Sequence, residues 1–226
     1  MQFHVTPDSR LLSAVEFVTR GGRIVDVGTD HAYLPIYLVQ KGLVSSALAA
    51  DINEGPIQSA CANVAAAELE SQIKTLRTDG LCGVEPFAPD DVLIFGMGGE
   101  LIVRILADAP WIKDAGIGLI LQPMSRASLL RAWLLENGFA ITGESITFED
   151  KYYQTVAARY CGKTEAYTEE ELALGKRNIL ARPPLFEGFV RHEIAVLSKI
   201  IDGKARSLDA DAAAEQRLKE KMERLL

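Results

Sequence analysis

Long apolar runs, paired cysteines and clustered histidines are all missing from this sequence of 226 residues. No run of about eighteen apolar residues occurs, and a membrane-spanning helix needs that length. The first residues contain no basic stretch followed by an apolar one, so we expect no secretion signal. Cys61, Cys82 and Cys161 are odd in number and far apart, which fits a reducing compartment. These absences predict a cytoplasmic protein that does not associate with a membrane.

Metal-ligand spacing is absent as well. No two cysteines form a CxxC pair, and His4, His31 and His192 are widely scattered. Zinc sites bring such residues together at short spacings. We therefore expect no bound metal ion.

Positive charge is scarce over most of the chain. The net charge is −7: residues 1–160 hold 12 Lys and Arg against 19 Asp and Glu, whereas residues 161–226 hold 12 of each. A surface for nucleic acid needs local positive charge, so contact with a polyanion is expected on the C-terminal part. The candidates for phosphate contacts are Arg177, Arg182, Arg191, Lys199, Lys204 and Arg206. Each of them alone is better explained as part of a solvated helix face.

What the sequence does contain is an alternation of short apolar strands with helices. Strands are predicted at 23–28, 47–51, 73–77, 91–96 and 118–122, and helices at 9–19, 33–41, 56–67, 99–107 and 128–136. Such alternation indicates right-handed βαβ units and a parallel sheet. Residues 140–148 and 152–160 follow as two extended stretches joined by Glu149-Asp150, which predicts an antiparallel hairpin at one edge. The predicted fold class is α/β, in an order that resembles class I, Rossmann-like methyltransferases.

Beyond residue 160 the sequence becomes helical. The stretch Thr168-Glu169-Glu170-Glu171 is predicted to cap a short helix. Residues 186–201 and 210–226 are predicted as two amphipathic helices around Asp202-Gly203 that pair antiparallel. We divide the chain into a domain over residues 1–162 and a helical arm over residues 163–226. Amphipathicity alone leaves open whether the arm only packs on the domain or binds a partner.

The stretch DVGTDHAYLP, residues 26–35, lies where the first strand gives way to a helix, the usual ligand end of an open α/β sheet. A dinucleotide site would have GxGxxG there, so that backbone amides can approach a pyrophosphate. This chain has Gly28 between two carboxylates, Asp26 and Asp30. Carboxylates repel a pyrophosphate and attract the sulfonium and ammonium groups of S-adenosylmethionine. The charges therefore favour this methyl donor over NAD.

Two further strands end in carboxylates. Asp51, with Ile52 beside it, closes the second strand 23 residues after Gly28, about where an acidic residue accepts hydrogen bonds from ribose hydroxyls. Asp79-Gly80 follows the third strand, where a carboxylate can bind the amino group of an adenine. Each aspartate alone is better explained as a helix N-cap. Carboxylates at the ends of three successive strands together favour donor binding.

The fourth strand ends in Gly96-Met97-Gly98-Gly99, at the position where the acceptor base sits in methyltransferases. Glycines permit unusual backbone angles and the close approach of a planar ligand. We include Gly96, Met97 and Gly98 in the expected donor site, with a plain tight turn as the competing explanation.

These motifs resemble those of the bacterial tRNA (adenine-N1)-methyltransferase family, TrmK, which modifies position 22 of tRNA. The resemblance covers about residues 8–160, and the C-terminal helices resemble the coiled-coil arm of that family. It implies a class I methyltransferase fold, S-adenosyl-L-methionine as the donor and tRNA as the acceptor. Thr29 stands where relatives often have serine, and Asp51 where they often have glutamate; both changes are conservative. Besides residues 26–35 and 96–99, the matching residues are Arg10-Leu11, Glu54-Gly55-Pro56, Asp79-Gly80-Leu81 and Leu121-Gln122-Pro123.

The implied acceptor sets the expected catalytic residues. Adenine N1 carries a lone pair and no proton, so it can attack the methyl carbon without a general base, and catalysis comes mainly from positioning. We expect Asp30 to accept a hydrogen bond from the adenine N6 amine, because the product ring is cationic. His31 and Tyr33 are expected to orient the base or stack on it, although a helix cap and a core residue explain them too. The base has to be unpaired or extruded, because N1 lies on its pairing edge.

Other functions stay open at this point. The same donor site would serve a methyltransferase of another RNA or of a small molecule. A non-catalytic RNA- or protein-binding module on this scaffold is a second alternative, and an NAD-dependent oxidoreductase comes last because of the charges. The sequence indicates neither the tRNA species nor the oligomeric state.

Overall fold

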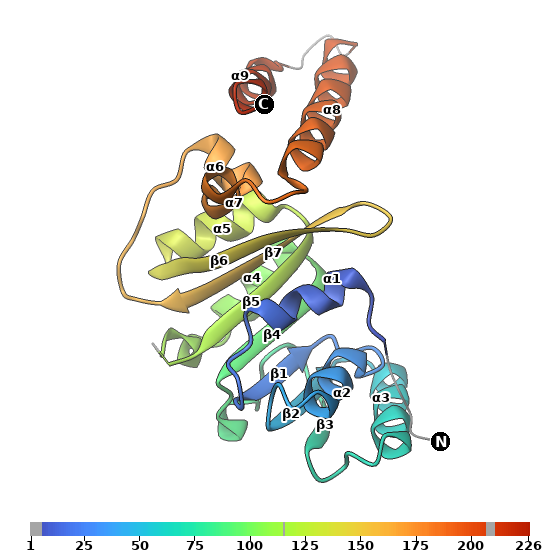
Figure 1. Cartoon of the computed structure of the whole chain (residues 1–226). Helices are drawn as coiled ribbons and strands as arrows, with labels where there is room; N and C mark the ends of the chain where they lie inside the picture. Colours follow the sequence, from blue (N-terminus) through green and yellow to red (C-terminus); the bar gives the residue numbers. More distant parts are fainter. Residues whose placement is uncertain (1–5, 115, 207–210) are drawn as a thin grey trace.

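One mixed sheet of seven strands is the framework of the computed structural model, which describes residues 6–114, 116–206 and 211–226 (Figure 1). The strand order is β3-β2-β1-β4-β5-β7-β6. Strands β1 to β5 run parallel, and β7 runs antiparallel to both of its neighbours. The predicted parallel sheet with a hairpin at one edge is therefore confirmed. The strands are β1 (Arg23–Val27), β2 (Ser46–Asp51), β3 (Ile73–Arg77), β4 (Asp91–Gly98), β5 (Gly118–Ser125), β6 (Phe139–Phe148) and β7 (Tyr152–Tyr160).

Helices cover both faces of the sheet. On one face, α2 (Tyr33–Gln40) and α3 (Glu54–Ala66) pack in a buried cluster with Ile24 and Leu93. On the other, α4 (Gly99–Ala107) and α5 (Ala127–Glu136) pack with Val25 and Ile94. Adjacent strand residues contribute to opposite clusters because side chains alternate across a strand. Burial on both faces explains why β1 and β4 are apolar along most of their length.

The leading helix is shorter than predicted. The α-helix α1 spans Ser9–Leu12, and a 3₁₀ turn follows over Ser13–Glu16, instead of one helix over 9–19. The Ser13 hydroxyl bonds to the Arg10 carbonyl at 2.7 Å and lies 2.7 Å from the Thr155 hydroxyl, which draws the chain toward the hairpin. The Thr19 amide donates a hydrogen bond to the Asp91 carboxylate at 2.6 Å. It is therefore not available for a hydrogen bond within a helix.

Among the described residues, four helices follow the sheet: α6 (Glu169–Leu174), α7 (Lys176–Ala181), α8 (Phe186–Ala205) and α9 (Ala213–Glu223). The predicted cap of α6 is confirmed, and Thr168 forms a capping box with Glu171. The expected break at Asp202-Gly203 is wrong, because α8 continues to Ala205; glycine in a helix costs only about 1 kcal/mol relative to alanine. Of the predicted last helix, α9 covers 213–223, and residue 210 lies outside the described part of the chain.

The C-terminal helices α8 and α9 pair antiparallel, as predicted. Lys204 near the end of α8 bonds to Glu215 near the start of α9 at 2.6 Å. At the opposite end, the Arg182 guanidinium donates to the Leu225 carbonyl at 2.7 Å. Phe189 and Met222 share a buried cluster with Ile146 of β6, so the arm is packed on the sheet. The domain boundary at residue 162 stays a prediction.

A fully buried ion pair joins α5 to strand β6, and its arginine also contacts α6. The Arg131 Nε of α5 lies 2.6 Å from the Glu144 carboxylate of β6, and neither side chain is exposed. Arg131 also donates to the carbonyls of Leu172 and Ala173 and to the Gln154 amide oxygen. No helix among the described residues is long and apolar enough to cross a membrane.

Candidate active site

The carboxyl end of β1 opens into a short loop that leads to α2. Gly28 has φ of +80°, a conformation that favours glycine. The amides of Gly28 and Thr29 both donate to the Ala50 carbonyl of β2, at 2.8 and 3.1 Å. This double attachment turns the chain sharply, so the side chains of the loop line the edge of the sheet where β1, β2 and β4 end.

A cavity of about 410 Å³ lies at this edge. Six of the predicted site residues line it: Asp26, Gly28, Asp30, His31, Tyr33 and Gly96. The other lining residues come from the N-terminal segment (Asp8, Arg10, Leu11), the first loop and α2 (Thr29, Ala32, Leu34) and β4 (Phe95). The motif that begins at Asp26 therefore shares its cavity with the segment around α1.

The remaining predicted residues lie around this cavity without lining it. Asp51 accepts a hydrogen bond from the Asn53 amide at 2.7 Å, which shapes the entry to α3, and Ile52 is exposed. Asp79 and Gly80 line a separate hollow of about 330 Å³ together with Arg104 and Asp108. Met97 and Gly98 belong to neither hollow; the Met97 methyl group packs directly on Gly28. Six residues of the expected set thus line the first cavity, two line the second hollow, and four line neither.

Asp26 is the most perturbed acid of the cavity. Its side chain is buried, and burial raises its pKa to about 6. The Asp51 carboxylate acts in the same direction, whereas the Thr29 hydroxyl and the Arg10 guanidinium oppose it. The Thr29 hydroxyl is itself buried and has no well-aligned hydrogen-bond partner among the described residues. A buried carboxylate beside an open cavity is poised to take a cationic ligand.

Asp30, His31 and Tyr33 form the rim. The His31 Nε2 lies 3.3 Å from the Asp30 carboxylate, and the His31 and Tyr33 rings stack with centroids 5.1 Å apart. The Asp30 side chain is 73% exposed and that of His31 42%, so both can reach a ligand. The Asn63 amide holds the His31 carbonyl at 2.9 Å. Two exposed stacked rings beside a carboxylate suit a planar, amino-bearing ligand.

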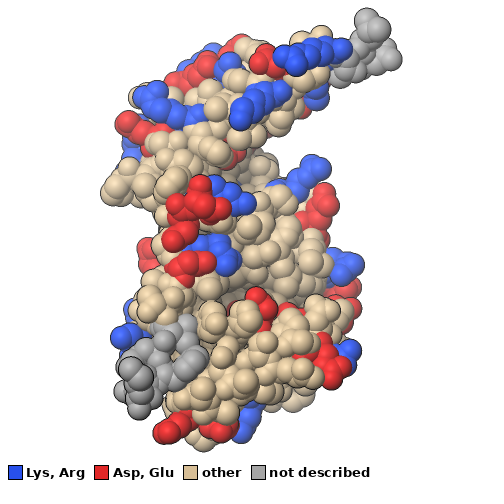
Figure 2. All heavy atoms as spheres, turned by 90° about the vertical axis from the view of Figure 1, so that its right-hand side faces the viewer, with Lys and Arg blue, Asp and Glu red and all other residues tan. Residues whose placement is uncertain are grey.

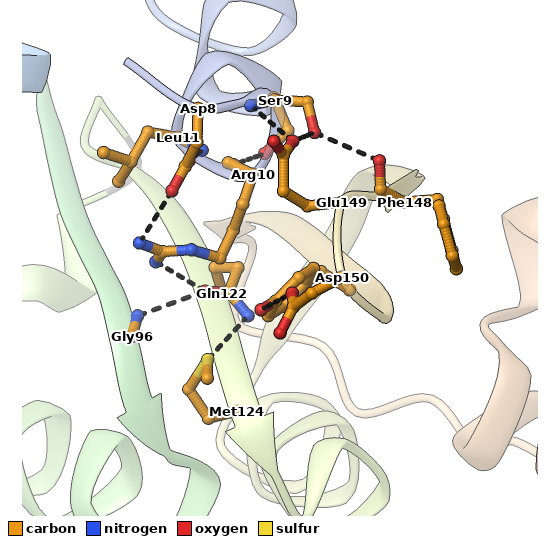
Figure 3. A network of polar contacts seen from close by, with 12 residues as sticks. Asp8, Ser9, Arg10, Leu11, Gly96, Gln122, Met124, Phe148, Glu149 and Asp150 are labelled. Carbon is orange, nitrogen blue, oxygen red and sulfur yellow. Dashed lines mark hydrogen bonds and ion pairs between the residues drawn. The ribbon is translucent and has the colours of Figure 1, made fainter.

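Gln122 and Arg10 form a network that sequence reasoning assigned no role (Figure 3). The buried Gln122 Oε1 accepts from the Gly96 amide and from Arg10 Nη1, both at 3.2 Å. Its Nε2 donates to the Pro123 carbonyl at 3.1 Å. Arg10 also lies 3.4 Å from Asp8 and over the Tyr153 ring. The result is a guanidinium held in a fixed place at the cavity wall.

The N-terminal segment is fastened to the hairpin that ends the sheet. Asp8 caps α1 by accepting from the Leu11 amide at 2.8 Å. The Ser9 hydroxyl bonds to the Glu149 carboxylate and to the Phe148 carbonyl, as Figure 3 shows. Only the resemblance pointed to Arg10-Leu11 and Leu121-Gln122-Pro123, because partners more than a hundred positions apart leave no local pattern.

The charges of the cavity define what it can bind. Among its described lining residues, three are aspartates and Arg10 is the only Lys or Arg. This set fits a ligand with cationic groups and one anionic group, which is the charge pattern of S-adenosylmethionine: a sulfonium, an ammonium and a carboxylate. Within the described residues, no group of three His, Cys, Asp or Glu could hold a metal ion.

Comparison with known proteins gives consistent matches. A family model described as a methyltransferase domain matches residues 8–156. The tRNA (adenine(22)-N(1))-methyltransferase of Bacillus subtilis is 37% identical over 170 residues, 74% of this chain and 70% of the relative. A crystal structure of B. subtilis TrmK has a TM-score of 0.84 at 28% identity, with 98% of each chain covered. A Streptococcus pneumoniae protein in complex with S-adenosyl-L-methionine also has a TM-score of 0.84, at 32% identity over 96% of this chain and 99% of that one.

Proposed function

The chain belongs to the family of tRNA (adenine(22)-N(1))-methyltransferases, and from this membership we propose that it transfers a methyl group from S-adenosyl-L-methionine to N1 of adenine 22 in tRNA. The donor supplies an electrophilic methyl group on a sulfonium. As the N1–carbon bond forms, the carbon–sulfur bond breaks, and the positive charge passes to the adenine ring. No proton has to leave N1, so the residues of the chain act by holding and orienting both reactants.

For the donor, we assign opposite roles to Asp26 and Arg10. The buried Asp26 carboxylate attracts the cationic groups, and the Arg10 guanidinium, held by Gln122, pairs with the carboxylate of the donor. This arrangement of one buried acid and one anchored cation in a single cavity is the observation that carries the proposal. Gly28, with its positive φ, lets the backbone approach closely. Asp51 is assigned to the ribose hydroxyls.

The adenine of the donor is assigned to the second hollow, next to Asp79 and Gly80. Ile52 is exposed between the end of β2 and the start of α3 and supplies an apolar surface for that ring. Met97 and Gly98 follow Gly96 at the end of β4, where the Met97 side chain rests on Gly28. A ligand with two ends can occupy both hollows, which accounts for the division of the predicted residues between them.

For the acceptor, we assign the rim. The Asp30 carboxylate accepts from the N6 amine of the target adenine, which stabilises the positive charge that develops on the ring. The stacked pair of His31 and Tyr33 lies beside it and offers a surface for the extruded base. Because Asp30 is largely exposed, its role requires that the bound RNA excludes water from the rim.

The tRNA body is assigned to the C-terminal part. Of the six basic candidates, Arg177, Arg182 and Lys204 are engaged in the fold, through the Ile141 carbonyl, the Leu225 carbonyl and Glu215. Arg191 and Lys199 are exposed on α8. We therefore infer that phosphate contacts come from exposed cations of the arm such as these two. A cytoplasmic location follows from the tRNA substrate.

The test is methylation of an unmodified tRNA transcript by the purified protein, with the product nucleosides identified by mass spectrometry. We expect 1-methyladenosine, mapped to position 22. The Asp30→Asn variant is expected to bind the donor with unchanged Kd and to lose turnover. Methylation at another atom or on another RNA would redirect the proposal, and failure to bind S-adenosyl-L-methionine at all would refute it.

A further inference from the structure

A second groove opens at the junction of the sheet with the C-terminal arm. Its volume is about 210 Å³. It is bounded by the chain that leaves β5, by the start of β7 and by the first half of α8. The residues that define its chemistry are Met124, Arg126, Tyr152, Gln154 and Glu193. None of them belongs to the donor site or to the rim described above.

Gln122 links the lining of the groove to the wall of the active site. The Gln122 Nε2 lies 3.7 Å from the Met124 sulfur (Figure 3), while Gln122 Oε1 holds Arg10 and Gly96 at the cavity wall. Strand β7 separates the two spaces. The Tyr153 ring faces Arg10, and its neighbour Tyr152 lines the groove, because successive side chains point to opposite sides.

The polar groups of the groove have unused hydrogen-bonding capacity. Glu193 is half-buried and makes no hydrogen bond or ion pair among the described residues. Burial raises the pKa of its carboxyl group, and His192 and Arg131 act against this shift. The Gln154 Oε1 accepts from Arg131 at 2.7 Å, so its NH₂ group is left to donate. A half-buried carboxylate that accepts no hydrogen bond from the protein is free to accept one from a ligand.

The apolar part of the groove suits a flat ring. Met124 is 39% exposed, and Tyr152 packs edge-on against Phe148 and at an angle to Phe189, with centroids 4.9 and 5.8 Å apart. The Tyr152 hydroxyl fits closely against Gly188 of α8, which fixes the ring. Aromatic and thioether side chains stack on any base.

Basic side chains lie around the groove. The Arg126 side chain is 69% exposed at the rim of the groove. On the face shown in Figure 2, Lys and Arg side chains gather over the C-terminal helices, above the hollow that separates them from the body of the molecule. This distribution favours a polyanion that runs across the junction over a peptide or a small acid.

We propose that this groove is a second nucleotide pocket, which receives the base of one of the two nucleotides that flank the target adenine. A purine stacks on Tyr152 and Met124, and its exocyclic amine donates to Glu193. The pocket rests on the proposed function and deepens it. Binding of a neighbouring base in this pocket stabilises the extruded conformation of the target base. A base with no exocyclic amine loses the Glu193 contact.

The test compares transcripts in which each flanking nucleotide in turn is replaced by an abasic site. For wild-type protein, we expect one of the two replacements to lower kcat/KM and to raise the Kd of the RNA by about tenfold or more, the size of a stacking contact. Glu193→Ala is expected to weaken binding of the native transcript by about tenfold. It should cause less than a twofold further loss on the abasic transcript, because the partner of Glu193 is already missing.

Controls separate this pocket from a general effect. Asp202→Ala removes an exposed negative charge from the same helix and should leave both constants unchanged. Glu193→Gln keeps one acceptor oxygen and should retain most of the affinity for RNA. The affinity for the methyl donor should be unchanged in every variant. Equal tolerance of both abasic sites, or full multiplication of the Glu193→Ala and abasic losses, would overturn the pocket. The Kd comparison remains decisive even if wild-type protein transferred no methyl group, a result that would instead refute the proposed function.

Discussion

Replacing Asp26 with asparagine should weaken donor binding and at the same time stabilise the free protein. Because the pKa of Asp26 is raised to about 6, the carboxylate is about one-tenth ionised at pH 5 and about nine-tenths ionised at pH 7. If the ionised form binds the cationic donor, the Kd of wild-type protein should fall about tenfold between these pH values. Asp26→Asn should abolish that slope and raise the Kd at pH 7 by roughly ten- to a hundredfold.

The stability effect has the opposite sign. Between the ordinary pKa of 3.8 and the folded value of about 6, the folded state keeps a proton that the unfolded state has lost. Stability therefore falls as the pH rises through this window. At pH 7 the difference between the two pKa values corresponds to about 3 kcal/mol. Asparagine carries no charge to bury, so the variant should gain up to that amount, or roughly 6–12 °C in Tm for a chain of this length.

Isothermal titration calorimetry with S-adenosyl-L-methionine at pH 5, 6 and 7 and thermal unfolding of the free protein at the same pH values measure both effects. Asp202→Asn, at an exposed position of α8, is the matched control and should change neither. A wild-type Kd that does not vary between pH 5 and pH 7 would refute the role given to Asp26. A variant that is less stable than wild type at pH 7 would refute the stability cost assigned to the buried Asp26 carboxylate.

Three further predictions concern other parts of the structure. Arg131→Met should lower the free energy of unfolding by about 3–5 kcal/mol in urea titration, because it leaves Glu144 buried without its partner; adding Glu144→Gln should recover part of the loss, and no recovery would contradict the ion-pair explanation. Gly99→Ala should cost about 1–3 kcal/mol, because its Cβ would lie 2.5 Å from the Arg126 carbonyl oxygen, whereas Gly55→Ala, with open space around it, should not destabilise the protein. Arg10→Ala should weaken binding of S-adenosyl-L-methionine about tenfold or more and leave binding of decarboxylated S-adenosylmethionine unchanged; equal losses for both ligands would show that Arg10 does not contact the carboxylate.

Local patterns were sufficient to predict the sheet. The short apolar runs predict every strand to within a few residues, because burial on both faces leaves a continuous apolar run. The helix ends were harder. The Asp202-Gly203 pair has the composition of a break, yet α8 passes through it, since the cost of one glycine is small beside the packing of α8 on α9.

In the candidate site too, local features could be predicted from the sequence and long-range contacts could not. Asp26, Gly28 and Asp30 follow one another in the sequence, so their shared cavity could be predicted. The contact of Arg10 with Gln122 spans 112 positions, and only the fold brings the two together. Asp79 and Asp26 line different hollows, a separation that no periodicity of the sequence encodes. The binding roles of Asp26 and Arg10 are predictions that the calorimetric titrations described above test.

The attachment of the first helix to the last hairpin has a consequence for biosynthesis. Ser9 bonds to Glu149, and Ser13 to Thr155, across 140 and 142 positions. During translation the opening residues therefore emerge long before their partners exist, and the wall that carries Arg10 can be completed only when the final strand has left the ribosome. A truncated nascent chain that lacks β7 has no finished cavity, so methyl-donor binding reports on synthesis through β7.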